Sequence, residues 1–309
     1  MTRLLISLRR FALYRGLLEL YGRSPLLRLI LVAIIPVLWI GATNITPLFQ
    51  MVEISFYDRY PVPQGEPIEW TGRHYATFFE RPLYITAFLR SFIFASLATI
   101  VTLIVVFPVA YYISKAAPKN MRTRLLLLVV APFWVSEIIR SFAWIVMLAN
   151  RGAVNSFFSL IGMPGTPFDL LYNNVSLTIG VVYLTSLYML LPLYAALEKI
   201  DDNLLEAAAN LGAPAWQRFF RVVLPLSREG IVAGCTLVFL LVIGLYAMPQ
   251  LLGGPSNTLF ASTIGQIFSK AGDSWPLGSA FSIILTGSAL AYVGLFVALF
   301  QRKRRGRAA

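Results

Sequence analysis

The chain has 309 residues, of which 58% are hydrophobic and only 13% are charged. Soluble domains carry about 25% charged residues, and here the apolar residues stand in long unbroken runs, so an ordinary soluble fold is excluded and a membrane protein is predicted. The net charge of +12 does not indicate nucleic-acid binding, because the basic residues lie between the apolar runs and near the termini. One cysteine, Cys235, and one histidine, His74, exclude an internal disulfide and a zinc site. His74 lies in a polar loop and is expected to be solvated.

The segment 1–25 interleaves arginines with leucines and lacks the charge-free core and small-residue cleavage site of a signal peptide. This pattern predicts a basic amphipathic helix that lies on the inner leaflet as a surface anchor. A docking role is the alternative interpretation of the same segment.

Six later stretches are long and apolar enough to cross a bilayer, which takes about 20 residues. Each is expected to be a helix, because an open strand in lipid leaves its backbone groups unpaired. They are Leu29–Met51, Ser91–Ser114, Leu125–Ala149, Val175–Leu197, about Gly230–Leu252 and about Ser279–Gln301. The predicted fold is therefore an all-α membrane protein, with one six-helix domain at 26–301 and a basic tail at 302–309.

The distribution of charge sets the expected orientation of these spans. Arginine and lysine dominate the segment before the first span, the connection between the second and third spans, and the tail. The first loop instead carries more acids than bases. Positive charge marks the cytoplasmic side, so both termini are predicted to be cytoplasmic and the bilayer to be an inner membrane.

The chain lacks the G-x-x-x-x-G-K-[ST] pattern that cradles nucleotide phosphates. No paired carboxylates or Ser/His set suggests catalysis, and the spans hold few ionisable groups of the kind that a self-powered proton-coupled carrier needs. We therefore expect a transporter component that is not an enzyme and binds no cofactor. Its energy source would be another polypeptide.

The cytoplasmic loop 201–225 joins the fourth and fifth predicted spans. Asp201 or Asp202 is placed to cap a first short helix, and Gly212 to end it. Pro214 suits the first turn of a second helix, which Leu224-Pro225 would end. The second helix is amphipathic, with four apolar residues expected on one side: Trp216, Phe219, Phe220 and Val223. On physical grounds alone, a helix pair that merely connects two spans is an equally good interpretation.

The same loop resembles the EAA loop of bacterial ABC-importer permeases. Glu206-Ala207-Ala208, Gly212, Leu224 and Pro225 stand at the family spacing, and Val222 replaces the usual isoleucine. The resemblance implies a coupling helix that docks in a groove of an ATPase subunit. The residues that it assigns to coupling are Glu206, Ala207, Ala208, Gly212, Trp216, Phe219, Leu224 and Pro225.

Three further segments resemble the spermidine/putrescine permeases within that family. They are Arg140–Trp144 with Gly152 and Asn155, Met248–Gly254, and Trp275–Ala280. The resemblance implies a type I importer fold, a second and different permease subunit, two ATPase subunits that bind ATP and Mg²⁺, and a periplasmic binding protein. Opines or other small amino compounds are the alternative cargo. An ATP-independent carrier or channel, and an exporter or assembly scaffold, are the alternative classes.

Glu137 and Arg140 lie in the middle of the third predicted span, where charges are costly and usually face a protein interior or a water-filled cavity. Their spacing allows an internal ion pair. In the alternative interpretation, Glu137 lines a pathway and meets a cationic amine beside aromatic rings. The candidate pathway residues are Trp134, Glu137, Arg140, Ser141 and Trp144, with Tyr188 and Tyr246 on the fourth and fifth spans. Packing is the competing interpretation of the aromatic ones.

Overall fold

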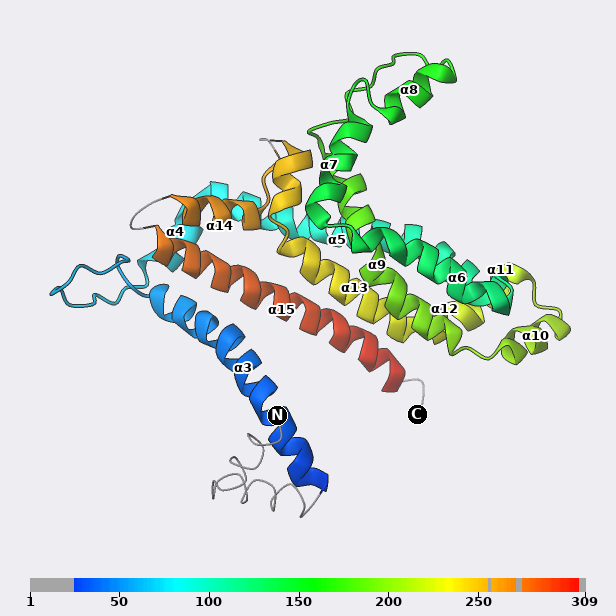
Figure 1. Cartoon of the computed structure of the whole chain (residues 1–309), viewed down its shortest axis with the longest axis horizontal. Helices are drawn as coiled ribbons and strands as arrows, with labels where there is room; N and C mark the ends of the chain where they lie inside the picture. The colour runs from blue at the N-terminus through cyan, green and yellow to red at the C-terminus, as the bar shows by residue number, and fades with distance from the viewer. Residues whose placement is uncertain (1–24, 255–256, 271–273, 306–309) are drawn as a thin grey trace, which may run out of the picture.

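The computed structural model describes residues 25–254, 257–270 and 274–305, and this part of the chain is almost entirely helical (Figure 1). Four helical segments are long and apolar enough to cross a membrane: Val32–Ile54, Pro82–Ala116, Asn174–Glu198 and Trp275–Phe300. They correspond to α3 (Pro25–Ile54), α5 (Pro82–Tyr111) with the π-helical turn η1 (Tyr112–Ala116), α9 (Asn174–Glu198) and α15 (Trp275–Arg305). Two bent helix pairs raise the number of candidate spans to six, which confirms an all-α membrane fold. The predicted segment 1–25 lies outside the described residues apart from Pro25.

The third predicted span is not one straight helix, so the prediction of a continuous Leu125–Ala149 helix was wrong. α6 (Lys119–Val130) runs into a 3₁₀ turn, η2 (Ala131–Trp134), and α7 (Glu137–Leu148) and α8 (Ala153–Leu160) follow after a bend of 91°. Val135 and Ser136 are extended, with ψ of 139° and 141°. The helical hydrogen bonds therefore stop at Trp134 and begin again with Ser136 as the N-cap of α7.

The fifth predicted span is also interrupted. α13 (Arg228–Ile243) follows α12 (Leu224–Leu226) across a bend of 66°, and Gly244 then caps its end. The predicted continuation to Leu252 is replaced by a turn and a π-helical segment, η4 (Pro249–Gly253). α14 (Phe260–Ser269) was not predicted, because a ten-residue helix is too short to register as a span.

α5, α9 and α13 pack against one another and form the centre of the bundle. Glycine lets α9 and α13 approach closely: a Cβ atom at Gly230 would lie 2.6 Å from the carbonyl oxygen of Pro192 and 2.5 Å from the Cβ atom of Ala196. Gly234, one turn later, faces Met189 in the same way. Small residues four apart on a helix are a common way for membrane helices to pack without a hydrophobic driving force.

α4 (Arg73–Glu80) and α14 pack on the first part of α15. Their contact is aromatic, with the rings of Phe260 and Phe281 stacked at 5.5 Å and Phe78 edge-on to both. His74 is buried in α4, where its Nε2 atom lies 2.9 Å from the carbonyl oxygen of Tyr57. The expectation that His74 is solvated was wrong, because the loop folds back over it.

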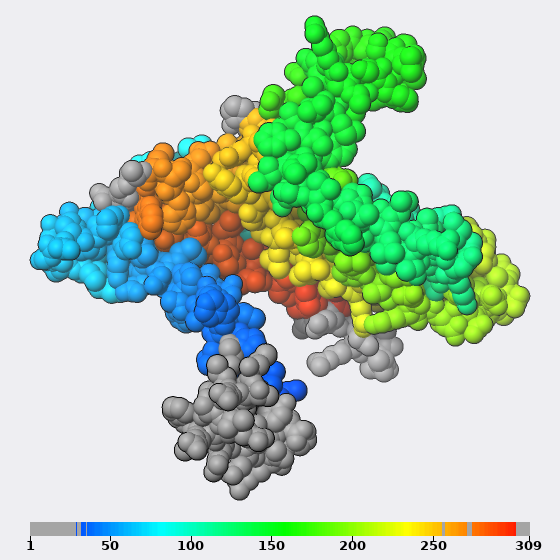
Figure 2. Space-filling model, in the orientation of Figure 1, coloured from blue at the N-terminus to red at the C-terminus, as the bar shows by residue number. Residues whose placement is uncertain are grey.

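Two parts of the chain project from this bundle. α3 diverges from α15, and α7 with α8 forms an arm on another side (Figures 1 and 2). The most apolar window of α3 has no buried residue. These apolar surfaces are consequently free to contact lipid or another subunit.

Candidate coupling loop and membrane groove

The first helix of the loop, α10 (Asp202–Asn210), is capped at both ends as the sequence predicted. The carboxylate of Asp201 accepts a hydrogen bond from the backbone N–H of Asn203 at 3.0 Å. At the other end, Gly212 has φ of +81° and donates its N–H to the carbonyl of Ala209, while Ala213 donates to Ala208. This double hydrogen bond is a Schellman motif, whose left-handed position favours glycine.

The second half of the loop differs from the prediction in its register. α11 (Ala215–Arg218) passes into the π-helical turn η3 (Phe219–Val223) and then α12, so Leu224-Pro225 does not end the helix. The wider π turn rotates the later residues relative to the earlier ones. As a result, Val223 is fully buried and Phe219 packs edge-on to Phe107, whereas Trp216 and Phe220 are exposed. The expected single apolar face therefore does not exist.

The exposed side of the loop combines an acid with apolar groups. Glu206 lies in the middle of α10 and is exposed, and no residue of this helix is fully buried. Leu211 is 88% exposed and Trp216 60% exposed. α10 and α11 lie together at one end of the molecule in Figure 1, away from α8 and α14. The loop thus offers apolar side chains and a carboxylate to another molecule.

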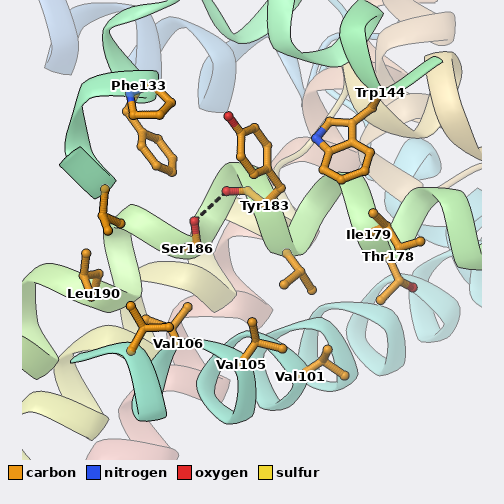
Figure 3. Close-up of a pocket in the computed structure, with 14 residues that line it drawn as sticks. Val101, Val105, Val106, Phe133, Trp144, Thr178, Ile179, Tyr183, Ser186 and Leu190 are labelled. Carbon is orange, nitrogen blue, oxygen red and sulfur yellow. Dashed lines mark hydrogen bonds between the residues drawn. The ribbon is translucent and has the colours of Figure 1, made fainter. Parts of the chain in front are cut away.

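A groove of about 590 Å³ opens between α5, α9 and the broken third span (Figure 3). Its walls are almost entirely apolar. Three aromatic residues stand along it, with Tyr183 of α9 between Phe133 of η2 and Trp144 of α7. The rings of Tyr183 and Phe133 are stacked at 5.8 Å, and those of Tyr183 and Trp144 meet edge-on at 5.5 Å. The remaining lining residues are Val101, Val105, Val106, Val109, Val129, Pro132, Thr178, Ile179, Val182, Ser186 and Leu190.

Arg140 uses this aromatic wall in place of an ion pair. Its guanidinium carbon lies 4.7 Å from the ring centre of Phe133 and 5.8 Å from that of Tyr183. Among the described residues, Arg140 forms no ion pair with Glu137, and its Nε and Nη1 atoms are buried without a hydrogen-bond partner. Cation–π attraction is stronger where water is excluded, so the rings take over part of the role that a carboxylate would have.

The bend separates Trp134 from the other predicted pathway residues of the third span, Glu137, Arg140, Ser141 and Trp144, which all lie on α7. Trp134 lies before the bend and is 86% exposed, whereas Glu137 is the exposed first residue of α7. Ser141 is buried, and its hydroxyl oxygen lies 2.8 Å from the carbonyl oxygen of Glu137 and 2.9 Å from the sulfur of Met248, the two acceptors for its one proton. Of the predicted set, Trp144 alone lines the groove.

Tyr188 and Tyr246 are both exposed and neither lines the groove. The ring of Tyr246 packs against Gly265 of α14, where an added Cβ atom would lie 2.1 Å from it. Sequence reasoning missed Phe133 and Tyr183. The one local signal for Phe133 was its place beside Trp134, and for Tyr183 there was none, because the fold brings α9 to the third span.

Comparison with known proteins identifies the chain. The model of the family described as "binding-protein-dependent transport system inner membrane component" matches residues 125–306. This chain belongs to that family. The match covers the broken third span and α9, which line part of the groove, together with the loop and the last span, and it makes the chain a multi-pass inner-membrane permease component of an importer and not an enzyme.

Curated relatives extend the match. The chain is 42% identical to the spermidine/putrescine transport system permease protein PotB of Haemophilus influenzae over 216 residues, which are 70% of this chain and 74% of the relative. It is 31% identical to the inner membrane ABC transporter permease protein YdcU of Escherichia coli, over 91% of both chains.

A solved structure supports the fold independently. A chain of a bacterial ABC transporter involved in the import of the acidic polysaccharide alginate superposes with a TM-score of 0.72, over 93% of this chain and 99% of that chain, at 19% identity. The type I importer fold implied by the sequence is thereby confirmed.

Proposed function

We propose that this chain is the permease subunit of an ATP-driven importer for polyamines such as spermidine and putrescine, or for related organic cations. The similarity to the PotB permeases carries the assignment of the substrate. The assembly would contain a second, different permease subunit, two ATPase subunits that bind ATP and Mg²⁺, and a periplasmic protein that delivers the solute. Both termini would be cytoplasmic, and nucleic acid would have no part in it.

The loop is the surface that meets the ATPase in this proposal. Closure of the ATPase subunits would displace the loops of the two permeases and open the pathway outward, and reopening would release the solute inside. The exposed carboxylate of Glu206 and the exposed apolar side chains of Leu211 and Trp216 support this assignment. Apolar anchors that become buried usually carry most of the energy of an interface.

Copurification tests the partner. In membranes that also contain the ATPase subunit, the Leu211→Ala and Trp216→Ala variants are expected to retain less ATPase than the wild-type chain. Leu160→Ala is the matched control, because Leu160 is 85% exposed but lies on α8, distant from the loop. If the wild-type chain never retains an ATPase subunit, the proposed function is wrong and an ATP-independent carrier becomes the better interpretation.

The cationic amine would meet the aromatic wall of the groove and the carboxylate of Glu137. Phe133 and Tyr183 already hold one cation, the guanidinium of Arg140, which supports the suitability of this wall for ammonium groups. Glu137 and Trp144 are seven residues apart on α7 and therefore share a side of that helix.

Uptake by the reconstituted complex tests the substrate. Glu137→Gln is expected to lower spermidine uptake, and Glu80→Gln, at an exposed site on α4, serves as the control. Equal uptake by the two variants would remove Glu137 from the pathway. Uptake of an opine in preference to spermidine by the wild-type complex would overturn the polyamine assignment.

A further inference from the structure

One lysine joins the end of the second span to the start of the loop. Lys115 lies in η1, and its side chain is only 5% exposed. Its ammonium group donates hydrogen bonds to the carboxylate of Asp202, at 2.7 Å, and to the backbone carbonyl of Ile200. These three residues, Lys115, Ile200 and Asp202, are called the Lys115 latch below.

Both ends of the latch are held by the fold. On one side, the N–H of Ala117 donates to the carbonyl of Tyr112 at 2.8 Å, which closes the π turn that carries Lys115. Arg122 then donates its Nε–H to the carbonyl of Ala117 at 3.1 Å. On the other side, the side chain of Ile200 is buried in the core at the end of α9. The ammonium group therefore has a fixed position between two spans.

The latch matters because α10 has few other attachments. None of its nine residues is fully buried, and Leu205 is its one apolar side chain packed against the hydrophobic core, so packing holds α10 through few side chains. Asp202 is the first residue of α10, and Glu206 follows one turn later. The hydrogen bond from the ammonium group of Lys115 stabilises the charged form of Asp202 and holds the pKa of that carboxyl below its usual value. A charge buried this deeply is costly to leave without its partner.

We infer that Lys115 is a positioning residue of the transport cycle: it fixes the start of α10 to α5 and α9, so that displacement of the loop moves the spans. Without the Lys115 contact, the backbone at residues 199–202 would bend when α10 is displaced, and the spans would not move with it. This inference rests on the proposed function for its role in transport, whereas the positioning of α10 itself does not.

The test uses the complete complex of both permeases, the ATPase subunits and the binding protein, reconstituted in lipid. Lys115→Met is expected to preserve assembly and ATP hydrolysis but to lower spermidine uptake per ATP by about fivefold or more, the lower range of measured couplings between sites. Lys119→Met is the control. Lys119 is exposed, lines the same pocket as Lys115 and Asp202, and forms no ion pair in the described part of the chain.

Two further variants separate the latch from a general loss of structure. Lys115→Arg is expected to keep most of the coupling, and Lys115→Glu combined with Asp202→Lys is expected to couple better than either single change. Equal uptake per ATP for Lys115→Met and Lys119→Met would overturn the inference, as would a double variant no better than its parents.

Hydrogen exchange of the backbone amides of α10 gives a readout that needs no cargo. Lys115→Met is expected to raise exchange in α10, and Lys119→Met is not. If the wild-type complex takes up no polyamine but exchange still rises, the proposed substrate fails and the latch stands. If exchange in α10 does not change, the latch fails whatever the cargo is.

Discussion

The close contact between α9 and α13 predicts the order of stability of three Gly→Ala variants. In Gly230→Ala the new methyl group would lie 2.6 Å from the backbone carbonyl oxygen of Pro192 and 3.2 Å from the Cα atom of Leu193. Backbone atoms cannot rotate away, so the two helices must separate. Overpacking of this kind costs about 1–3 kcal/mol, and a rigid neighbour favours the upper end. The higher helix propensity of alanine offsets about 1 kcal/mol, which leaves a net loss of about 2 kcal/mol.

Two other glycines serve as comparisons for Gly230, because an alanine at either position would meet a weaker obstacle or none. In Gly234→Ala the nearest obstacle is the sulfur of Met189 at 2.6 Å, which is part of a flexible side chain, so the net effect should be close to zero. At Gly287 of α15 an added Cβ atom meets nothing within 4 Å. That variant should keep the propensity gain of about 1 kcal/mol.

Thermal unfolding of the purified permease in detergent measures the order. We expect Gly230→Ala to be the least stable of the three variants, Gly234→Ala to be intermediate and Gly287→Ala to be the most stable. If Gly230→Ala is as stable as Gly287→Ala, the two helices are not in contact at this point, and the reasoning on close approach is refuted.

The loop and the groove give two more expectations. Gly212→Val should lower ATP-driven uptake, because a β-branched residue strongly disfavours φ of +81°, while Gly212→Asn should retain more uptake, since asparagine tolerates this conformation; equal uptake by both would count against the Schellman end of α10. Tyr183→Leu should raise the Michaelis constant for spermidine uptake more than Tyr183→Phe, because phenylalanine keeps the ring that stacks on Phe133. The same Michaelis constant for both variants would show that the ring does not contact the amine.

The sequence predicted the helices that run straight and missed the places where they break. The predicted first, second, fourth and sixth spans lie within α3, α5 with η1, α9 and α15, since a long apolar run needs only hydrophobicity to be recognised, although α5 begins nine residues before the predicted Ser91. The third span kept its composition across Val135 and Ser136, so hydropathy could not show the 91° bend there. Pro132 was a weak signal, because prolines are tolerated inside membrane helices. Pro108 and Pro192 indeed lie within continuous helices.

The same limit applies to the sites. The caps of α10 were predictable because Asp201 and Gly212 act on their own helix. The groove was not predictable, since Tyr183 and Trp144 belong to different spans and meet only in the fold. The side chain of Lys115 also reaches across 87 residues to Asp202. Spacing within one helix is readable from the sequence, but contacts between helices are not.

Close packing at glycines and the polar Lys115 latch are two kinds of contact that suit a permease whose spans are moved by displacement of its cytoplasmic loop. In lipid, apolar packing between helices has no hydrophobic driving force, so close approach of small residues and polar links must hold the spans together. Gly230 and Gly234 provide the first for α9 and α13, and the Lys115 latch provides the second for α5 and α10. α10 itself packs against the core only through the partly buried side chain of Leu205. A displacement of Glu206 and its exposed apolar neighbours would therefore be transmitted through the Lys115 latch to α5, α9 and α13. These three helices pack tightly together and can move as one unit.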